Sequence, residues 1–241
     1  MTTAMDRYFE IVNSTGSSLT GLDGLGELFA GNVLLMDCGD MVQGRELAVG
    51  FHREQAAARK ESTYQWTVSA QADGTLTGNW SRAGLDAHGN AESASGHFTA
   101  SLDPDGRIAL LHLTLTAGSD RARLAIAKHL EVWMTPDPIE RARAMEDIYT
   151  EDIEILEPED VFVGRDTIND YIAVVQSKAP PLSGRITSHT QNKDYILWGW
   201  DFGFPGDKRA LGTEVLHMRG DLIEKIVIFS GDSDVFTEGT R

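Results

Sequence analysis

The chain has 241 residues and a formal net charge of −16, from 37 acidic side chains against 21 Lys and Arg. This negative charge is spread over both halves of the sequence, which argues against nucleic acid or an anionic membrane surface as a partner. Cys38 is the only cysteine, so no intrachain disulfide can form. No apolar run reaches the roughly 20 residues that cross a bilayer, and none near the N-terminus resembles a signal peptide. We therefore expect a cytoplasmic protein.

The first half begins with helical patterns and continues with strand patterns. Apolar residues at helical spacing predict helices over 5–13, 22–29 and 46–60, the last of them closed by Arg59-Lys60. A strand over 33–36 precedes the longest of these helices and carries Asp37 at its end. Alternating patterns and two Asp/Gly turns predict two antiparallel hairpins over 64–80 and 96–116.

The second half repeats this order. Helices are predicted over 124–133, 139–149 and 167–178, and a strand over 153–156 delivers Glu157. Four further strands are predicted over 184–190, 195–204, 211–219 and 222–229.

Two segments that lie 120 positions apart, 28–46 and 148–166, share one plan without a gap. We therefore predict an α+β protein of two tandem modules, 1–118 and 124–231, followed by a loose tail over 232–241. Each module holds three helices and a mostly antiparallel sheet that curls over the long helix. The matched positions are Phe29 and Tyr149, Asp37 and Glu157, Gly44-Arg45 and Gly164-Arg165, and Trp80 and Trp200.

This order of elements resembles the nuclear transport factor 2-like superfamily, which includes ketosteroid isomerases, SnoaL-type polyketide cyclases and small epoxide hydrolases. The run Tyr149-x-x-Asp152-Ile153-x-Ile155-x-Glu157-Pro158, followed by Gly164-Arg165, is similar to the ketosteroid isomerase pattern. The resemblance covers nearly the whole chain, twice. It implies cone-shaped modules that pack as an intrachain pseudo-dimer, in a chain that is itself monomeric or homodimeric. The fold hosts enzymes, binding modules and oligomerisation domains.

In the second module the resemblance implies an acid–base pair. Glu157 matches the proton-shuttling aspartate of the isomerases, and Glu214 matches the protonated acid of their oxyanion hole. Alternation along 195–204 places its aromatic side chains on one face. If Glu214 faces the same way, two carboxyls share an aromatic-walled cavity, one as base and one as acid. The expected substrate contacts are His129, near the oxyanion-hole tyrosine, and Tyr171, Trp198, Trp200 and Phe202.

In the first module the same comparison gives a different set. Tyr8 matches the oxyanion-hole tyrosine and Asp37 matches the base, whereas Phe98 stands at the second acid's position. Asp37 and Tyr8 are therefore a second candidate catalytic pair, with Phe51, Trp80 and Phe98 as candidate substrate contacts. The alternative is that this module is a structural half without chemistry. No His, Cys or Asp spacing suggests a metal, and we expect no metal or cofactor.

Two functions follow from these patterns. The first is a cofactor-independent isomerase, cyclase or epoxide-opening enzyme for a hydrophobic oxygenated small molecule such as a polyketide or terpenoid. The alternative is a non-catalytic small-molecule-binding or scaffold protein of the same fold. A buried carboxyl pair favours the enzyme, and a cone filled by Trp198, Trp200 and Phe98 favours the scaffold.

Overall fold

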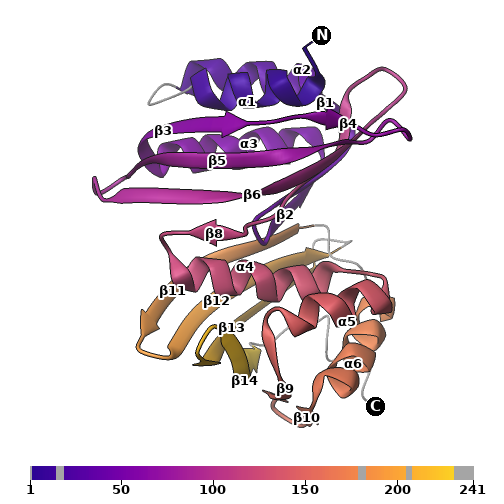
Figure 1. Cartoon of the computed structure of the whole chain (residues 1–241), viewed down its shortest axis with the longest axis vertical. Coiled ribbons are helices and arrows are strands. Elements are labelled where there is room, and N and C mark those ends of the chain that lie inside the picture. The colour runs from indigo at the N-terminus through magenta and orange to yellow at the C-terminus, as the bar shows by residue number, and fades with distance from the viewer. Residues whose placement is uncertain (1, 15–18, 179–182, 205–207, 231–241) are drawn as a thin grey trace. The chain divides into compact units, whose positions relative to one another are not determined.

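The computed structural model describes residues 2–14, 19–178, 183–204 and 208–230 (Figure 1). The chain divides into two compact units, Met1–Leu124 and Ala125–Arg241. Each unit combines helices with a mostly antiparallel sheet, which confirms the predicted α+β class. No helix in the described ranges has the length and apolar character needed to span a membrane. The predicted loose tail, 232–241, lies outside these ranges.

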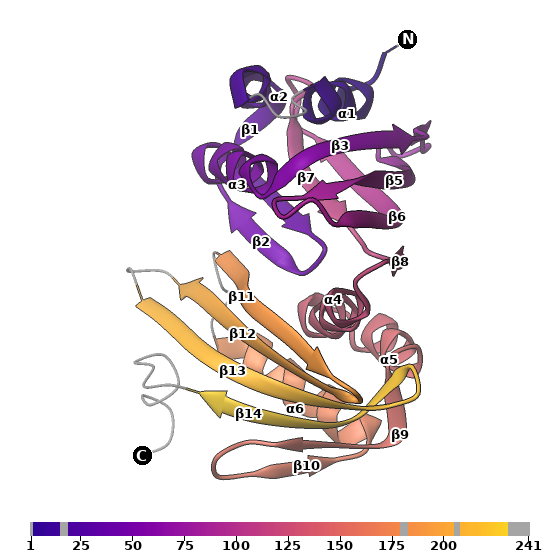
Figure 2. The same ribbon diagram turned by 90° about the vertical axis from the view of Figure 1, so that its left-hand side faces the viewer.

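Along the chain of unit 1, the long helix follows the second strand and precedes the third, and the path can be followed in Figures 1 and 2. Helix α1 contacts β3, and α3 contacts β1, β2 and β3. The sheet order is β2-β1-β7-β6-β5-β3, with β4 on β5 and β8 on β6, and only the β1–β7 pair among these is parallel. The elements are α1 Ala4–Ser14, η1 Leu19–Gly24, α2 Leu25–Leu28, β1 Phe29–Asp37, β2 Asp40–Gln43, α3 Arg45–Ala57, β3 Arg59–Trp66, β4 Ser69–Ala70, β5 Leu76–Asp86, β6 Ala91–Leu102, β7 Ile108–Leu113 and β8 Ala117–Gly118.

Unit 2 follows the same plan, and helix α4 begins in the last residues of unit 1. Its sheet order is β10-β9-β14-β13-β12-β11, and the β14–β9 pair is parallel. Helices α5 and α6 contact each other and β9. The elements are α4 Arg121–Met134, α5 Pro138–Glu146, β9 Tyr149–Leu156, β10 Val161–Val163, α6 Arg165–Lys178, β11 Ser183–Asn192, β12 Tyr195–Phe204, β13 Lys208–Arg219 and β14 Leu222–Ser230.

Two helix ends were predicted too late. Helix α3 ends at Ala57, and Arg59 opens β3, where its guanidinium pairs with Glu92 at 3.0 Å. Helix α5 ends at Glu146, and Tyr149 opens β9 with its side chain fully buried. In both places pairing with a strand distant in the sequence overrides the local helical pattern.

A glycine followed by an arginine starts the long helix of each unit. Gly44 and Gly164 have φ of +105° and +85°, a region that favours glycine. Arg45 then donates from Nε to the carbonyl oxygen of Phe29 at 2.9 Å. Arg165 donates from Nε and Nη2 to the carbonyl oxygen of Tyr149 at 3.1 and 2.6 Å. We call these contacts the arginine clamps. They join each long helix to the first residue of β1 or β9.

We expect Arg165→Ala to lower the free energy of unfolding by about 2 kcal/mol, because the buried carbonyl of Tyr149 loses a charged donor. Urea unfolding followed by circular dichroism measures this loss. Asp166→Ala, at the neighbouring exposed position, is the control and should change stability by less than about 0.5 kcal/mol. Equal losses in both variants would contradict a specific role for the clamp.

Candidate active site

Glu157 and Glu214 lie level with each other across the sheet of unit 2. Glu214 pairs with Ile228 of β14, and Val227 of β14 pairs with Leu156, the residue before Glu157. Only β14 separates the two carboxyl positions, so their Cα atoms are about 10 Å apart. The backbone N–H of Glu157 donates to the carbonyl of Asp160 at 2.9 Å, in the turn after β9.

The aromatic face predicted for β12 is present. Ile196, Trp198 and Trp200 are buried, whereas Leu197 between them is 44% exposed. Glu214 pairs with Trp198 across the strands and therefore points to the same face. It is 7% exposed. Phe202 continues this face as a half-buried ring 5.3 Å from Trp200.

His129 of α4 joins Glu214 to Tyr149, which was not predicted as a site residue. Its Nδ1 lies 2.7 Å from the hydroxyl of Tyr149, and its Nε2 lies 3.2 Å from Oε2 of Glu214. All three side chains are buried. Burial raises the pKa of Tyr149 well above its usual value, and the nearby Glu214 carboxyl raises it further. The repeat held a signal for this contact, since Tyr149 replaces Phe29 of the first module.

Glu157 has a tyrosine partner as well. The hydroxyl of Tyr171, on α6, donates to Oε1 of Glu157. The Tyr171 ring stacks on Phe162 with ring centres 4.0 Å apart, which fixes its direction. Burial, the hydrogen bond to Glu157 and the charges of Asp160 and Glu214 all raise the pKa of Tyr171. The strand register places Glu214 and Leu156, the residue before Glu157, on either side of β14, and the charges of both carboxyls raise the pKa of this one hydroxyl.

Trp133 stands between the two carboxyl systems. Its ring centre is 6.0 Å from that of Tyr171 and 6.1 Å from that of His129. It follows His129 by four residues and so shares its helix face. Sequence reasoning missed this residue, although that spacing was visible. The candidate site of unit 2 therefore runs from Glu157 through Tyr171, Trp133 and His129 to Glu214.

The corresponding cross-strand positions in unit 1 carry only one carboxyl, that of Asp37. Asp37 pairs with Leu113, Leu113 pairs with Phe98, and Phe98 pairs with Gly78. The Phe98 ring fills the space above Gly78, because a Cβ added there would meet it at 2.7 Å. It also packs against Phe9 with ring centres 5.5 Å apart. Unit 1 thus places an aromatic ring where unit 2 places Glu214.

Asp37 and Tyr8 are brought together, with His52 beside them. The Tyr8 hydroxyl lies 3.5 Å from Nε2 of His52, and both side chains are buried. The pKa of Tyr8 is raised by burial and then by Asp37, which is half-buried. Phe51 and Trp80, named as substrate contacts, are 2% and 5% exposed core residues. This cluster has one carboxyl and an imidazole in place of an acid pair.

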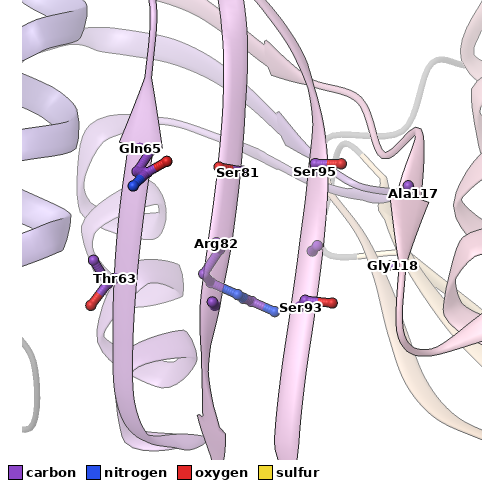
Figure 3. Close-up of a pocket in the computed structure, with 10 residues that line it drawn as sticks. Thr63, Gln65, Ser81, Arg82, Ser93, Ser95, Ala117 and Gly118 are labelled. Atoms are coloured by element: carbon purple, nitrogen blue, oxygen red, sulfur yellow. The ribbon is translucent and has the colours of Figure 1, made fainter.

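A pocket of about 420 Å³ lies in unit 1 beside β3, β5, β6 and β8 (Figure 3). Gln65 pairs with Ser81, and Ser81 pairs with Ser95, so these polar side chains share one sheet face. They alternate with Trp66 and Trp80, which point to the other face. Because its lining holds no carboxyl or imidazole, this pocket carries no acid–base chemistry. It is lined by Thr63, Gln65, Ser81, Arg82, Ala83, Ser93, Ala94, Ser95, Ala117 and Gly118.

His52 gives unit 1 a measurable pH dependence. Burial lowers its pKa from 6.5 to about 4, against a smaller opposite effect of Asp37. The unfolded chain therefore binds a proton near pH 6.5 that the folded chain does not bind until about pH 4. The stability that neutral His52 contributes is complete above pH 6.5 and is lost as the pH falls towards 4, by roughly 3 kcal/mol.

We expect His52→Gln to remove this part of the pH dependence. Urea unfolding at pH 7 and pH 4.5 measures it as the difference in stability loss between the unaltered chain and the variant. His88→Gln, at an exposed loop position, is the control and should keep the full loss. An identical loss in the unaltered chain and in His52→Gln would contradict burial of a neutral imidazole.

No protein-family model matches the sequence, and no curated protein matches it. Among solved structures, the chain is similar to an NTF2-like protein of unknown function from Exiguobacterium sp. 255-15, with 25% identity, 47% of this chain and 98% of that chain covered, and a TM-score of 0.43. A SnoaL-like family protein from Agrobacterium tumefaciens has 18% identity, 46% and 98% coverage and a TM-score of 0.42. A candidate polyketide cyclase from Xanthomonas campestris has 17% identity, 47% and 87% coverage and a TM-score of 0.41. The solved structures to which the chain is similar thus include NTF2-like and SnoaL-like proteins, the groups that the sequence patterns resemble, and each matches about half of the chain.

Proposed function

We propose that the chain is a cofactor-independent acid–base enzyme with its active site in unit 2. It would act as an isomerase, cyclase or epoxide-opening enzyme on a hydrophobic oxygenated small molecule such as a polyketide or terpenoid. The observation that carries this proposal is the level placement of Glu157 and Glu214 on one sheet face, with the half-buried Tyr171 against Glu157 and the buried His129 against Glu214. The single cysteine supports the cytoplasm as its location.

Glu157 is suited to the role of general base. The Tyr171 hydroxyl donates to it, so the contacted carboxyl oxygen is an acceptor, as a base requires. Glu157 directly follows β9 and is half-buried, so its side chain is partly exposed. Stacking on Phe162 holds Tyr171, and Tyr171 in turn orients Glu157.

Glu214 and His129 are suited to share the role of acid. A lone buried carboxylate is costly, whereas a carboxyl next to an imidazole can share one proton with it. Oε2 of Glu214 lies 3.2 Å from Nε2 of His129, so a proton carried by either group is placed to be donated to a substrate oxygen. The Tyr149 hydroxyl occupies Nδ1 and so fixes the ring orientation.

These roles give a balanced reaction without a cofactor. Glu157 takes a proton from the carbon next to a carbonyl, and the Glu214–His129 pair hydrogen-bonds or protonates the oxygen as the enolate forms. In an isomerisation Glu157 returns the proton to another carbon of the same system. In a cyclisation the enolate carbon instead bonds to a second carbonyl carbon. The oxygen of that second carbonyl then takes up the proton that Glu157 removed.

The alternative of a non-catalytic binding or scaffold module fits unit 1 better than unit 2. Phe9, Phe98 and Trp66 pack together there, and the second carboxyl is missing. We therefore assign unit 1 a structural role in the same proposal.

The test is α-proton exchange of 2-tetralone in D₂O, followed by ¹H NMR, with cyclisation and epoxide-opening assays on polyketide-like substrates beside it. We expect Glu157→Gln to reduce the turnover that the unaltered chain catalyses by about 100-fold or more while leaving the fold intact. Glu159→Gln, at an exposed position in the same turn, is the matched control and should keep full activity. Asp37→Asn should also keep full activity if unit 1 is structural. Undiminished turnover in Glu157→Gln would refute the assignment.

A further inference from the structure

The tryptophans of the two units differ in whether their indole N–H groups are satisfied. The chain has five tryptophans, and all lie within the described residues. In unit 1, Trp66 donates to Oδ1 of Asp6 at 3.1 Å and Trp80 donates to the carbonyl oxygen of His97 at 3.1 Å. In unit 2, the Nε1 atoms are buried and have no hydrogen-bond acceptor among the described residues. These are the indoles of Trp133, Trp198 and Trp200.

The contrast is sharpest at one repeated position. Trp80 pairs with Gly96, and Trp200, 120 residues later, pairs with Gly212. A Cβ added to Gly96 would meet Nε1 of Trp80 at 3.2 Å, so the nitrogen side of that indole faces the sheet. A Cβ added to Gly212 would meet Cζ2, Cε2 and Cη2 of Trp200 within 2.7 Å, so that indole lies directly over the glycine. Its Nε1 nevertheless has no acceptor among the described residues.

A buried N–H without an acceptor is unfavourable, and native proteins pair nearly all such groups. The buried N–H of Trp133 is partly accounted for, because it faces the Tyr149 hydroxyl and lowers the pKa of that group. Trp198 and Trp200 are not accounted for in this way. They are 1% and 6% exposed, so bulk water does not satisfy them. An acceptor that the described residues do not supply, either an ordered water or a ligand oxygen, would satisfy them.

Trp198 and Trp200 lie on the sheet face that also carries Glu214. Trp198 is the direct cross-strand neighbour of Glu214, and its ring centre is 5.9 Å from that of His129. Trp200 follows two residues later on the same face, at a distance of about 7 Å along the strand. An oxygen bound at Trp198 is therefore next to Glu214, and a second oxygen at Trp200 lies further along β12.

We propose that unit 2 binds a ligand that carries two acceptor oxygens of carbonyl type on an apolar frame, one for Trp198 and one for Trp200. This inference rests on the proposed function and names its substrate class. The oxygen at Trp198 belongs to the reacting carbonyl, because Glu214 and His129 act there. The oxygen at Trp200 fixes the position of the molecule and selects dicarbonyl compounds over compounds with one oxygen.

The test uses three probes with the same carbon skeleton, 1,4-diacetylbenzene, 4-ethylacetophenone and 1,4-diethylbenzene, and the indole N–H signals of ¹⁵N-labelled protein. We expect the diketone to move the signals of Trp198 and Trp200 downfield, as new hydrogen bonds form, and to leave those of Trp66 and Trp80 in place. Each hydrogen bond should tighten binding by about 2- to 10-fold, so affinity should fall from diketone to monoketone to hydrocarbon. The shifts are measured in the unaltered chain, and single Trp→Phe variants assign each indole signal to its residue.

Trp198→Phe and Trp200→Phe should each weaken diketone binding by about 2- to 10-fold more than they weaken 1,4-diethylbenzene binding, because the hydrocarbon loses only ring contacts. Trp80→Phe is the matched control, since its N–H already has an acceptor, and should leave diketone binding unchanged. Equal affinity for all three probes, shifts confined to Trp66 or Trp80, or no binding at all would overturn the proposal. Glu157→Gln separates it from the proposed function, because that variant should lose turnover and still bind the diketone as tightly.

Discussion

Each arginine clamp ties the start of a strand to the start of the long helix, and the position of the candidate site depends on it. A left-handed glycine turns the chain, and the next guanidinium binds the backbone carbonyl where β1 or β9 begins. A charged donor on a carbonyl is among the stronger hydrogen bonds in proteins. Because the strand start is fixed, the residue at its far end is fixed too. That residue is Asp37 in unit 1, and Glu157 directly follows the strand in unit 2.

From this common frame the two units differ in how they fill their interiors. Unit 2 buries an imidazole, a carboxyl and a tyrosine hydroxyl as one connected group, so each polar atom offsets the desolvation of another. Unit 1 buries a tyrosine next to a neutral histidine and surrounds them with phenylalanine rings. The first arrangement connects an imidazole to a carboxyl and a hydroxyl, whereas the second holds its histidine uncharged at neutral pH.

Much of the fold could be predicted from the sequence, because its signals are local or periodic. The repeat, the carboxyl at the end of the first strand and the buried face of β12 follow from spacing alone. The ends of two helices did not, since Arg59 and Tyr149 are drawn into strands by partners far along the chain. The hydrogen-bond partners of the site were missed for the same reason. Periodicity tells which face Tyr149 or Trp133 occupies, but not which atoms of other elements meet it there.

The cross-strand pair Gly78 and Phe98 of unit 1 corresponds to Trp198 and Glu214 in unit 2. This difference shows how a duplicated module changes its chemistry without changing its fold. In each unit one strand supplies a large ring and its neighbour a smaller residue, but the strand that supplies the ring differs. Either substitution alone is unfavourable. A tryptophan at Gly78 would collide with Phe98, and a glutamate at Phe98 would leave a void above Gly78. The two copies are therefore separated by a coupled pair of changes, a barrier that keeps duplicated halves distinct once they have diverged.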